Sequence, residues 1–359
     1  MTYDYISYLA SEIKDIAHRF EKELSLLEEE RKKEKDKKKR GEIKDKINKK
    51  MEELESLLKN NGGGTSLLSA GMVDKVSAWW LNDELPRREE VRNAYLNIVK
   101  HYQPTFPEKL KGLFCPPGFS NLPASDWLGF EITFTLKRPW FSRDDRAFHL
   151  LDNPLRKDRV FGVPFMPAAS WKGLLRWACR MQTGFLERLE TSGGKREGWK
   201  DVIVHLFGHE KGEMEHKNFR QGALVFYPTW FEKIDFELIN PHSRERRAGT
   251  QPLYYEVVPK DRKKDTKEDT KGKLYLLYAP LPGAGNTDGV QRSRAIEMLL
   301  KAVEALLTVY GISAKRTAGW GTAVIDHWQA YRKGSRPLPG DSLEKFLQAL
   351  EEEKWLQER

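Results

Sequence analysis

The chain has 359 residues, of which 39% are hydrophobic and 32% are charged, and its 62 basic against 53 acidic side chains give a net charge of +9. This composition predicts a globular protein with one large or two modest cores, and it favours an anionic partner, either nucleic acid or a lipid surface. Only Cys115 and Cys179 are present, which excludes a disulfide scaffold and a cysteine-based zinc site. No segment has the pattern of a signal peptide or a membrane span, so we expect a cytoplasmic protein with no membrane partner.

The first sixty residues are predicted to be helical. Apolar residues recur at steps of three and four over residues 13–27 and again over residues 43–58, which predicts two amphipathic helices. The Lys-rich segment 32–41 separates them, so residues 1–60 form either a helical hairpin or one long helix. We interpret the lysines as a solvated face or turn, with direct contact to RNA as the alternative.

A linker and a helical annex are predicted between these helices and the main domain. Residues 61–72 contain three consecutive glycines, which is typical of a flexible linker. Residues 73–125 carry helical patterns and then a Pro-rich stretch, and we expect them to pack on the main domain. That domain is predicted over residues 126–335, and a C-terminal helix or tail over residues 336–359.

The main domain alternates strands and helices. Apolar Phe130, Ile132, Phe134 and Leu136 alternate with polar residues, which is the two-residue period of a half-buried strand. The pattern continues with a helix at about 168–190, strands at 222–231 and 273–281, a helix at about 288–310 and a strand at 322–331. The order strand, helix, strand, strand, helix, strand predicts an α+β, ferredoxin-like domain whose antiparallel sheet is backed by helices.

Two insertions interrupt this order. The shorter one covers residues 189–201, and the longer one covers about 240–273 and is dense in Arg, Lys, Pro and Gly. Aromatic and β-branched residues in the longer insertion predict a protruding β-hairpin with its tip at 261–273. Near its start stand three arginines that are suited to phosphate contacts and base stacking, Arg244, Arg246 and Arg247. Single-stranded RNA is the target that such a set favours, and a solvated hairpin is the alternative.

The start of the predicted helix at 168 is a candidate phosphate site. Pro167 fits an early helical position because it lacks the amide that would be orphaned there, and Ser170 or free backbone amides can meet an oxyanion. Lys172 and Arg176 are four residues apart and share a helix face, so both can reinforce phosphate binding. The alternative is that Ser170 only caps the helix and that both cations are solvated.

A second candidate cluster comes after the predicted helix at 288–310. Lys315 and Arg316 supply positive charge, while Gly319 and Gly321 allow close backbone approach on either side of Trp320, whose ring can stack on a base. The alternative is a turn between helix and strand with Trp320 in the core.

These segments together resemble the RAMP superfamily of CRISPR proteins, particularly the backbone subunits of type III (Csm and Cmr) effector complexes. The similarity covers roughly residues 127–330. The matching motifs are Leu151–Pro154, Pro164–Arg176, Leu206–Gly208, Gly222–Phe226 and Gly319–Gly321. The second of them resembles the family's Pro-Gly-Ser-Ser-x-Lys-Gly helix start; Ala168 and Ala169 replace its Gly-Ser pair, whereas Ser170, Lys172 and Gly173 are retained.

The resemblance implies a ferredoxin-like fold related to the RRM, with a role in antiviral defence. Implied partners are a crRNA guide, a target RNA and the other subunits of the complex, and the insertion at 240–273 is the candidate for the thumb that interrupts the guide–target duplex. Catalytic members of the family have an Asp in the loop before the helix that supports metal-dependent cleavage of target RNA. Asp152 lies where that residue is expected, with Mg²⁺ as its cofactor and His149 as a candidate helper base.

The residues leave three functions open. The chain is a metal-dependent endoribonuclease through Asp152, a catalytically silent guide-binding or end-capping subunit, or a metal-independent crRNA-processing ribonuclease that uses histidine with Lys172 or Lys315. The histidines available for the third are His149, His205, His209, His216 and His242. For Asp152 alone, an Asx-turn before Asn153 is the alternative. Three nearby carboxylates can share or replace its role, Asp144, Asp145 and Asp158.

Overall fold

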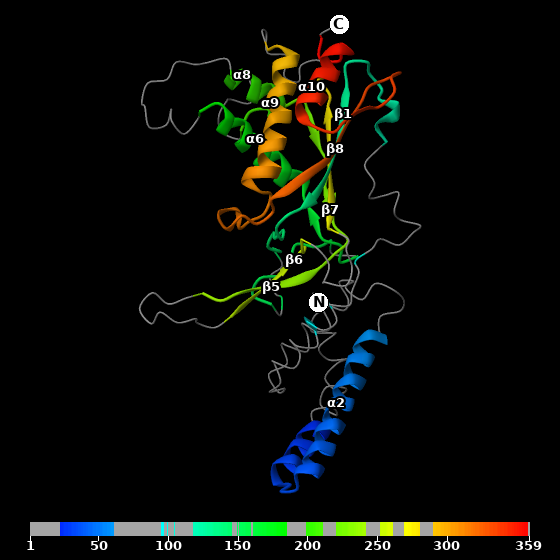
Figure 1. Cartoon of the computed structure of the whole chain (residues 1–359), viewed down its shortest axis with the longest axis vertical. Coiled ribbons are helices and arrows are strands. Elements are labelled where there is room, and N and C mark those ends of the chain that lie inside the picture. The colour runs from blue at the N-terminus through cyan, green and yellow to red at the C-terminus, as the bar shows by residue number, and fades with distance from the viewer. Residues whose placement is uncertain are drawn as a thin grey trace, which may run out of the picture. The chain divides into compact units, whose positions relative to one another are not determined.

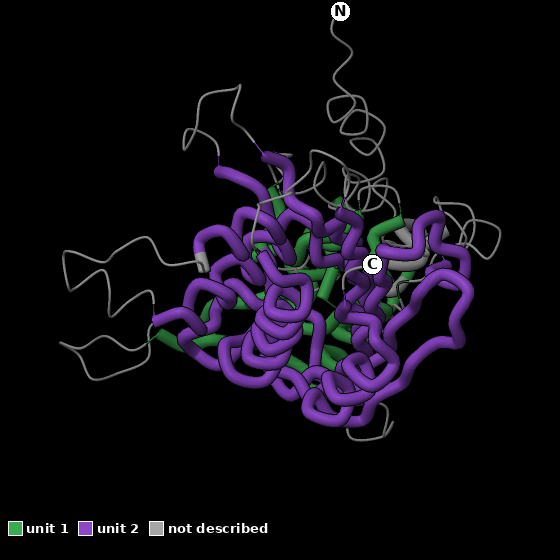
Figure 2. The backbone as a smooth tube through the Cα atoms, turned by 90° about the horizontal axis from the view of Figure 1, so that it is seen from above, with its two compact units in different colours: residues 1–106, 143–164, 232–257 green, residues 107–142, 165–231, 258–359 purple. Residues whose placement is uncertain are grey.

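The computed structural model describes residues 22–60, 95, 96, 99, 104, 118–145, 149, 151–158, 161–184, 199–210, 220–241, 252–260, 269–280 and 290–357. The chain divides into two compact units, which Figure 2 shows in two colours. Unit 1 comprises Met1–Phe106, Arg143–Pro164 and Glu232–Val257, and unit 2 comprises Pro107–Ser142, Phe165–Phe231 and Val258–Arg359. Residues 126–335, which we predicted as one domain, therefore contribute to both units.

A helical hairpin forms the N-terminal described part of unit 1. Residues 22–33 are helical, the chain leaves the helix at 34–36, and α2 follows at Lys37–Asn60 (Figure 1). The separator expected at 32–41 is therefore shorter, since its second half forms the first turn of α2.

Local polar contacts explain this hairpin. Asp36 Oδ1 accepts a hydrogen bond from Lys38 N at 2.8 Å, which satisfies one of the orphan amides at the start of α2. Lys50 Nζ lies 2.7 Å from Glu23 Oε2 of the preceding helix, so the two helices lie side by side.

A β-hairpin belongs to the same unit. Strand β5, Asp235–Ile239, pairs antiparallel with β6, Leu253–Val257. The region therefore contains a β-hairpin, but its strands flank residues 240–252 and not the expected tip at 261–273, whose last residues belong to strand β7 of unit 2. The three arginines of the insertion, Arg244, Arg246 and Arg247, lie outside the described residues.

Unit 2 contains a five-stranded antiparallel sheet in the order β3-β7-β1-β8-β9. Its strands are β1 (Leu128–Leu136), β3 (Leu224–Phe226), β7 (Lys271–Tyr278), β8 (Ala323–Tyr331) and β9 (Leu338–Gly340). A separate two-stranded pairing joins β2 (Phe165–Met166) to β4 (Thr229–Trp230). Strands β1, β3, β7 and β8 alternate with two of the helices as in the ferredoxin-like arrangement, which confirms the predicted fold. Strand β9 is added at the edge of this sheet.

Helices cover one face of this sheet (Figure 1). They are α6 (Ala168–Gln182), α8 (Trp199–Phe207) and α9 (Arg292–Ala305), which a π-helical turn extends (Leu306–Tyr310), and α10 (Leu343–Glu352) follows β9. The expected apolar face of α9 is confirmed, because its side chains are fully buried: Ile296, Leu299, Leu300, Val303, Leu306 and Leu307. Helix α8 was not predicted, and its first residues fall within the insertion assigned to 189–201. No helix in the described part of the chain is long and apolar enough to cross a membrane.

Side-chain alternation on β1 separates the two faces of the sheet. Phe130, Ile132 and Phe134 are completely buried, and the ring of Phe134 packs edge to face on Trp171 of α6 at 6.2 Å. The polar residues between them are half-buried on the opposite face. The predicted alternation of apolar and polar residues is therefore explained by a strand that packs against helices on one face.

The Leu-Phe-Gly motif is a site of close backbone packing. Gly208 ends α8 with a φ of 78°, and its amide faces Gly222 just before β3. A Cβ atom on Gly222 would lie 2.5 Å from Gly208 N and would overlap the Phe207 carbonyl carbon. Only glycine at position 222 therefore lets β3 approach the end of α8.

Replacing Gly222 by Ala is expected to lower the free energy of unfolding by about 1–3 kcal/mol, because backbone atoms cannot move aside as a flexible side chain does. Gly173→Ala is the matched control, since a Cβ atom there meets nothing within 4 Å and Ala favours the helix. Thermal unfolding of both variants tests this, and equal midpoints would contradict the close packing.

Candidate nucleic-acid interface

At the start of α6, Trp171 anchors the helix, and Pro167 occupies the N-cap position without a capping side chain. Pro167 occupies the N-cap position with extended backbone, φ −64° and ψ 149°, and no side chain caps the helix within the described residues. Ser170 therefore does not cap the helix; its amide donates to Pro167 O at 3.0 Å. The buried Trp171 indole donates to Thr229 Oγ1 at 3.0 Å, which fixes this helix start on β4.

Arg176 is engaged within the protein. Its guanidinium donates to Phe207 O at 2.8 Å and to Gly208 O at 3.2 Å, so it caps the carbonyl end of α8. It also donates to Glu210 Oε1 at 2.9 Å. Burial raises the pKa of Glu210, but the bonds and charges of Arg176 and Arg180 outweigh it, and the pKa is lowered. This cation holds two helices together, whereas the sequence predicted it on a phosphate.

Lys172 and Gly173 remain on the accessible side of the same helix. Lys172 is half-buried, and burial together with the neighbouring Arg176 lowers the pKa of its ammonium. Gly173 is exposed with open space above its Cα atom. Lys172 and Arg176 thus have different roles: Lys172 lies on the accessible side of the helix, and Arg176 is bonded to the end of α8.

The loop after α9 is built on two glycines with positive φ. Gly319 has a φ of 75° and ends a short 3-10 turn, Arg316–Ala318. Gly321 has a φ of 77°, and its amide donates to Pro139 O at 2.8 Å while its carbonyl accepts from Ile312 N at 3.0 Å. Trp320 is half-buried and packs edge to face on Phe141 at 6.4 Å. The segment is therefore a tight turn whose tryptophan keeps an accessible side.

The structure brings α6 and this loop into contact. Arg316 Cζ lies 4.4 Å from the ring centroid of Trp177, and that ring packs edge to face on Tyr310 at 4.8 Å. Nη1 of Arg316 is buried without a hydrogen-bond partner in the described part of the chain. Sequence reasoning selected Arg316 but missed Trp177, although it directly follows Arg176. Arg316 of the loop thus contacts the second half of α6, and both predicted clusters belong to unit 2. We refer to their residues together as the α6–loop surface: Ser170, Lys172, Gly173, Lys315, Arg316, Gly319, Trp320 and Gly321.

The other face of the sheet is filled by an aromatic side chain. Phe119, only 5% exposed, lies over Gly129 of β1, where a Cβ atom would be 2.5 Å from Phe119 Cγ. Three tyrosine rings surround it with centroid distances of 5.7–6.2 Å: Tyr227, Tyr275 and Tyr331. This region of the sheet is closed to base stacking of the RRM type.

The loop that carries Asp152 belongs to unit 1. Asp152 itself is exposed, while Leu151 and Pro154 on either side of it are buried. Asn153 forms a parallel bridge with Tyr255, so the loop runs alongside β6. The three other carboxylates have structural contacts: Asp144 is buried, Asp145 pairs with Arg156 at 3.7 Å, and Asp158 accepts from Phe161 N at 2.8 Å. Asp152 is thus the most available of the four.

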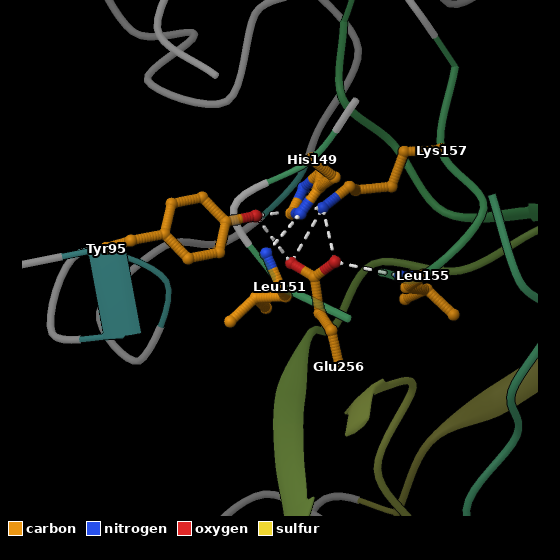
Figure 3. Close-up of polar contacts among 6 residues, drawn as sticks. All are labelled: Tyr95, His149, Leu151, Leu155, Lys157 and Glu256. Carbon is orange, nitrogen blue, oxygen red and sulfur yellow. Dashed lines mark hydrogen bonds and ion pairs between the residues drawn. The ribbon is translucent and has the colours of Figure 1, made fainter. Parts of the chain in front are cut away.

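A buried ion pair fixes this loop (Figure 3). Lys157 Nζ lies 2.6 Å from both carboxylate oxygens of Glu256, and the two side chains are 1% and 0% exposed. Tyr95 Oη donates to Glu256 Oε1 at 2.8 Å, and Leu155 N donates to Oε2 at 2.9 Å. Burial raises the pKa of Glu256, but Lys157, His149 and these hydrogen bonds outweigh it, so the pKa is lowered.

The three described candidate histidines make contacts within the protein. His149 Nδ1 accepts from Leu151 N at 3.1 Å, and its ring packs edge to face on Tyr95 at 5.6 Å, so it belongs to the buried cluster. His205 is buried with Nε2 2.8 Å from Tyr278 Oη. His209 Nδ1 accepts from Arg220 N at 2.9 Å. His216 and His242 lie outside the described residues.

Asp152 is the candidate ligand for a metal ion at this loop. Among the described residues, no three His, Cys, Asp or Glu side chains cluster as a ligand set. Mg²⁺ commonly keeps several waters and uses one or two carboxylates together with substrate phosphates. One exposed carboxylate on an anchored loop fits such an ion when a phosphate is present.

A model of the RAMP superfamily matches residues 133–324, more than half of the chain. The chain belongs to the RAMP superfamily. The match contains the Asp152 loop and the α6–loop surface, and it begins within β1. No curated protein matches the sequence.

Similar solved structures come from CRISPR complexes. A chain of type III-B Cmr-beta bound to cognate target RNA has 15% identity and a TM-score of 0.38, with 83% of this chain and 78% of that chain covered. A chain of a CRISPR RNA-guided surveillance complex has 17% identity and a TM-score of 0.40, with coverages of 64% and 80%. A chain of a type IV-B CRISPR complex has 12% identity and a TM-score of 0.36, with coverages of 60% and 96%.

The lowered pKa of Glu256 predicts an acid-dependent loss of stability. The contribution of this carboxylate is complete above the unfolded pKa of about 4.3 and is lost as the pH falls through the lower folded value. Compared with a Lys157→Met/Glu256→Gln variant, the wild type should therefore lose stability more steeply below about pH 4. Thermal unfolding midpoints from pH 3 to 8 measure this, and parallel curves would contradict it.

Proposed function

We propose that this chain is a crRNA-binding subunit of a type III CRISPR effector complex and that it cleaves target RNA through Asp152 with Mg²⁺. The observation that carries the RNA-binding part is the α6–loop surface of unit 2, which lies within the matched region and in which Arg316 of the glycine turn contacts Trp177 in the second half of α6. The other subunits of the complex are its protein partners.

The chemistry of the α6–loop surface favours a phosphate backbone. Among the described residues no side chain caps the start of α6, Lys172 and Lys315 add charge, and the planar Arg316 lies over the Trp177 ring. Trp320 adds an aromatic face on which a base can stack. Such contacts hold RNA independently of its sequence, as a guide that pairs with variable targets requires.

The cleavage part of the proposal is supported by the exposure and anchoring of Asp152. Bound Mg²⁺ neutralises charge on a phosphate during cleavage, and Asp152 would hold it together with the RNA and water. The role of the protein is to present that carboxylate on a loop that is anchored to β6. The family resemblance selects Asp152, and the contacts of the neighbouring carboxylates favour it over them.

Asp152→Ala is expected to abolish target cleavage and to preserve crRNA binding. Purified complex with partner subunits, crRNA and labelled target is assayed with Mg²⁺ or with EDTA. Asp145→Ala is the control, because its carboxylate pairs with Arg156 and should not be needed for cleavage. Retained cleavage in Asp152→Ala would remove its catalytic role, and RNA that is bound but never cut by the wild type would make the chain a silent guide-binding subunit.

Lys172→Ala is expected to weaken RNA binding and to reduce the slope of log affinity against log salt by about 1, because one phosphate contact is lost. Lys301→Ala is the control, since that lysine pairs with Glu297 on α9 at 2.6 Å. Fluorescence titrations at several salt concentrations give both slopes. Equal slopes would place the RNA away from the start of α6.

A further inference from the structure

The loop that carries Asp152 is bonded to β6 on both sides of Pro154. Glu256 N donates to Asn153 O at 3.1 Å, and Leu155 N donates back to the carboxylate of Glu256 at 2.9 Å. Asp152 directly precedes the first of these bonded residues. Since β6 is also one strand of the β5–β6 hairpin, one glutamate joins the exposed carboxylate to the base of that hairpin.

Lys157, which belongs to the same loop, forms an ion pair with Glu256. Its ammonium sits between both oxygens of Glu256 and 3.1 Å from Tyr95 Oη (Figure 3). The loop is therefore held at Leu155 and at Lys157 by one carboxylate. Sliding by a single residue would break the main-chain bond and the ion pair together.

Stability alone does not explain a pair that is so deeply buried. Removing two charges from water costs several kcal/mol per ion, and apolar side chains of similar volume often stabilise such sites equally well. Apolar packing is non-directional, however, and it allows a loop to settle in more than one register. Directional bonds to one carboxylate specify a single register, which matters where a reacting group must be placed.

We propose that Lys157 and Glu256 are positioning residues, which hold the Asp152 loop in one register on β6 so that target RNA is cut at one position. This inference rests on the proposed function of Asp152. Misplacement of a reacting group by about 1 Å can lower a rate roughly 100-fold, so a loop with several registers would cut slowly and at several neighbouring phosphates.

The test is carried out on the complete complex with crRNA, target RNA and Mg²⁺. The chain carries Lys157→Met and Glu256→Gln together, which removes both charges, preserves approximate side-chain volume and leaves an amide oxygen to accept from Leu155 N. The expected result is a kcat lowered roughly 100-fold with unchanged KM and target affinity, and products cut at several adjacent positions. Hydrogen exchange at the amides of Leu155 and Glu256 should become faster.

An exposed ion pair provides the matched control. Lys301→Met with Glu297→Gln removes a pair of the same 2.6 Å separation from α9, and it should leave kcat and the cut position unchanged. A buried double variant that cuts at one position with wild-type kcat, or whose two amides exchange as in the wild type, would overturn the positioning role. Asp152→Ala is assayed beside it: persistent cleavage there defeats the proposed function instead, whatever the double variant does.

A milder change serves if the double variant does not fold. Tyr95→Phe removes one donor to Glu256 and leaves the ion pair in place, so a smaller fall in kcat with unchanged KM is expected. Wild-type kcat and a single cut position in this variant would then overturn the proposal.

Discussion

A single buried carboxylate holds together three segments of unit 1 that are distant in sequence. Glu256 on β6 accepts hydrogen bonds from Tyr95 and Leu155 and pairs with Lys157, all within 2.9 Å. Removing one partner would leave a charge in an apolar environment, which typically costs about 3–5 kcal/mol. The exposed loop around Asp152 and the base of the β5–β6 hairpin therefore form one body, and the geometry of the candidate cleavage site depends on this contact.

In unit 2, helix α6 connects several elements, because its side chains contact different neighbours. Trp171 bonds to β4, Arg176 caps α8, Trp177 supports Arg316, and Lys172 is left at the surface. A motif that reads as a ligand-binding signature is thus largely a packing device. Trp171 and Arg176 fix the helix against its neighbours, whereas Ser170, Lys172 and Gly173 remain for a ligand.

Elements with a regular pattern could be predicted from the sequence, and contacts between distant segments could not. The alternation in β1 and the apolar face of α9 follow from periodicity, and their order implied the ferredoxin-like sheet. Helix α8 is too short for a clear period, and β9 is a three-residue edge strand that contains a proline. Arg176 and Lys172 share a spacing but not a role, because only the fold places α8 beside one of them. The partnership of Lys157 and Glu256, 99 residues apart, leaves no local signal.

Phe119 covers part of the sheet face on which RRM domains stack bases, and this limits how the sheet can contact RNA. Because the Phe119 ring covers this region, it offers no platform on which bases can stack as they do on an RRM sheet. Among the described residues, the α6–loop surface instead offers cations and a glycine turn, and contacts of this kind to a phosphate backbone carry no base sequence information. In the proposed function, a new guide sequence would therefore require no matching change in the α6–loop surface.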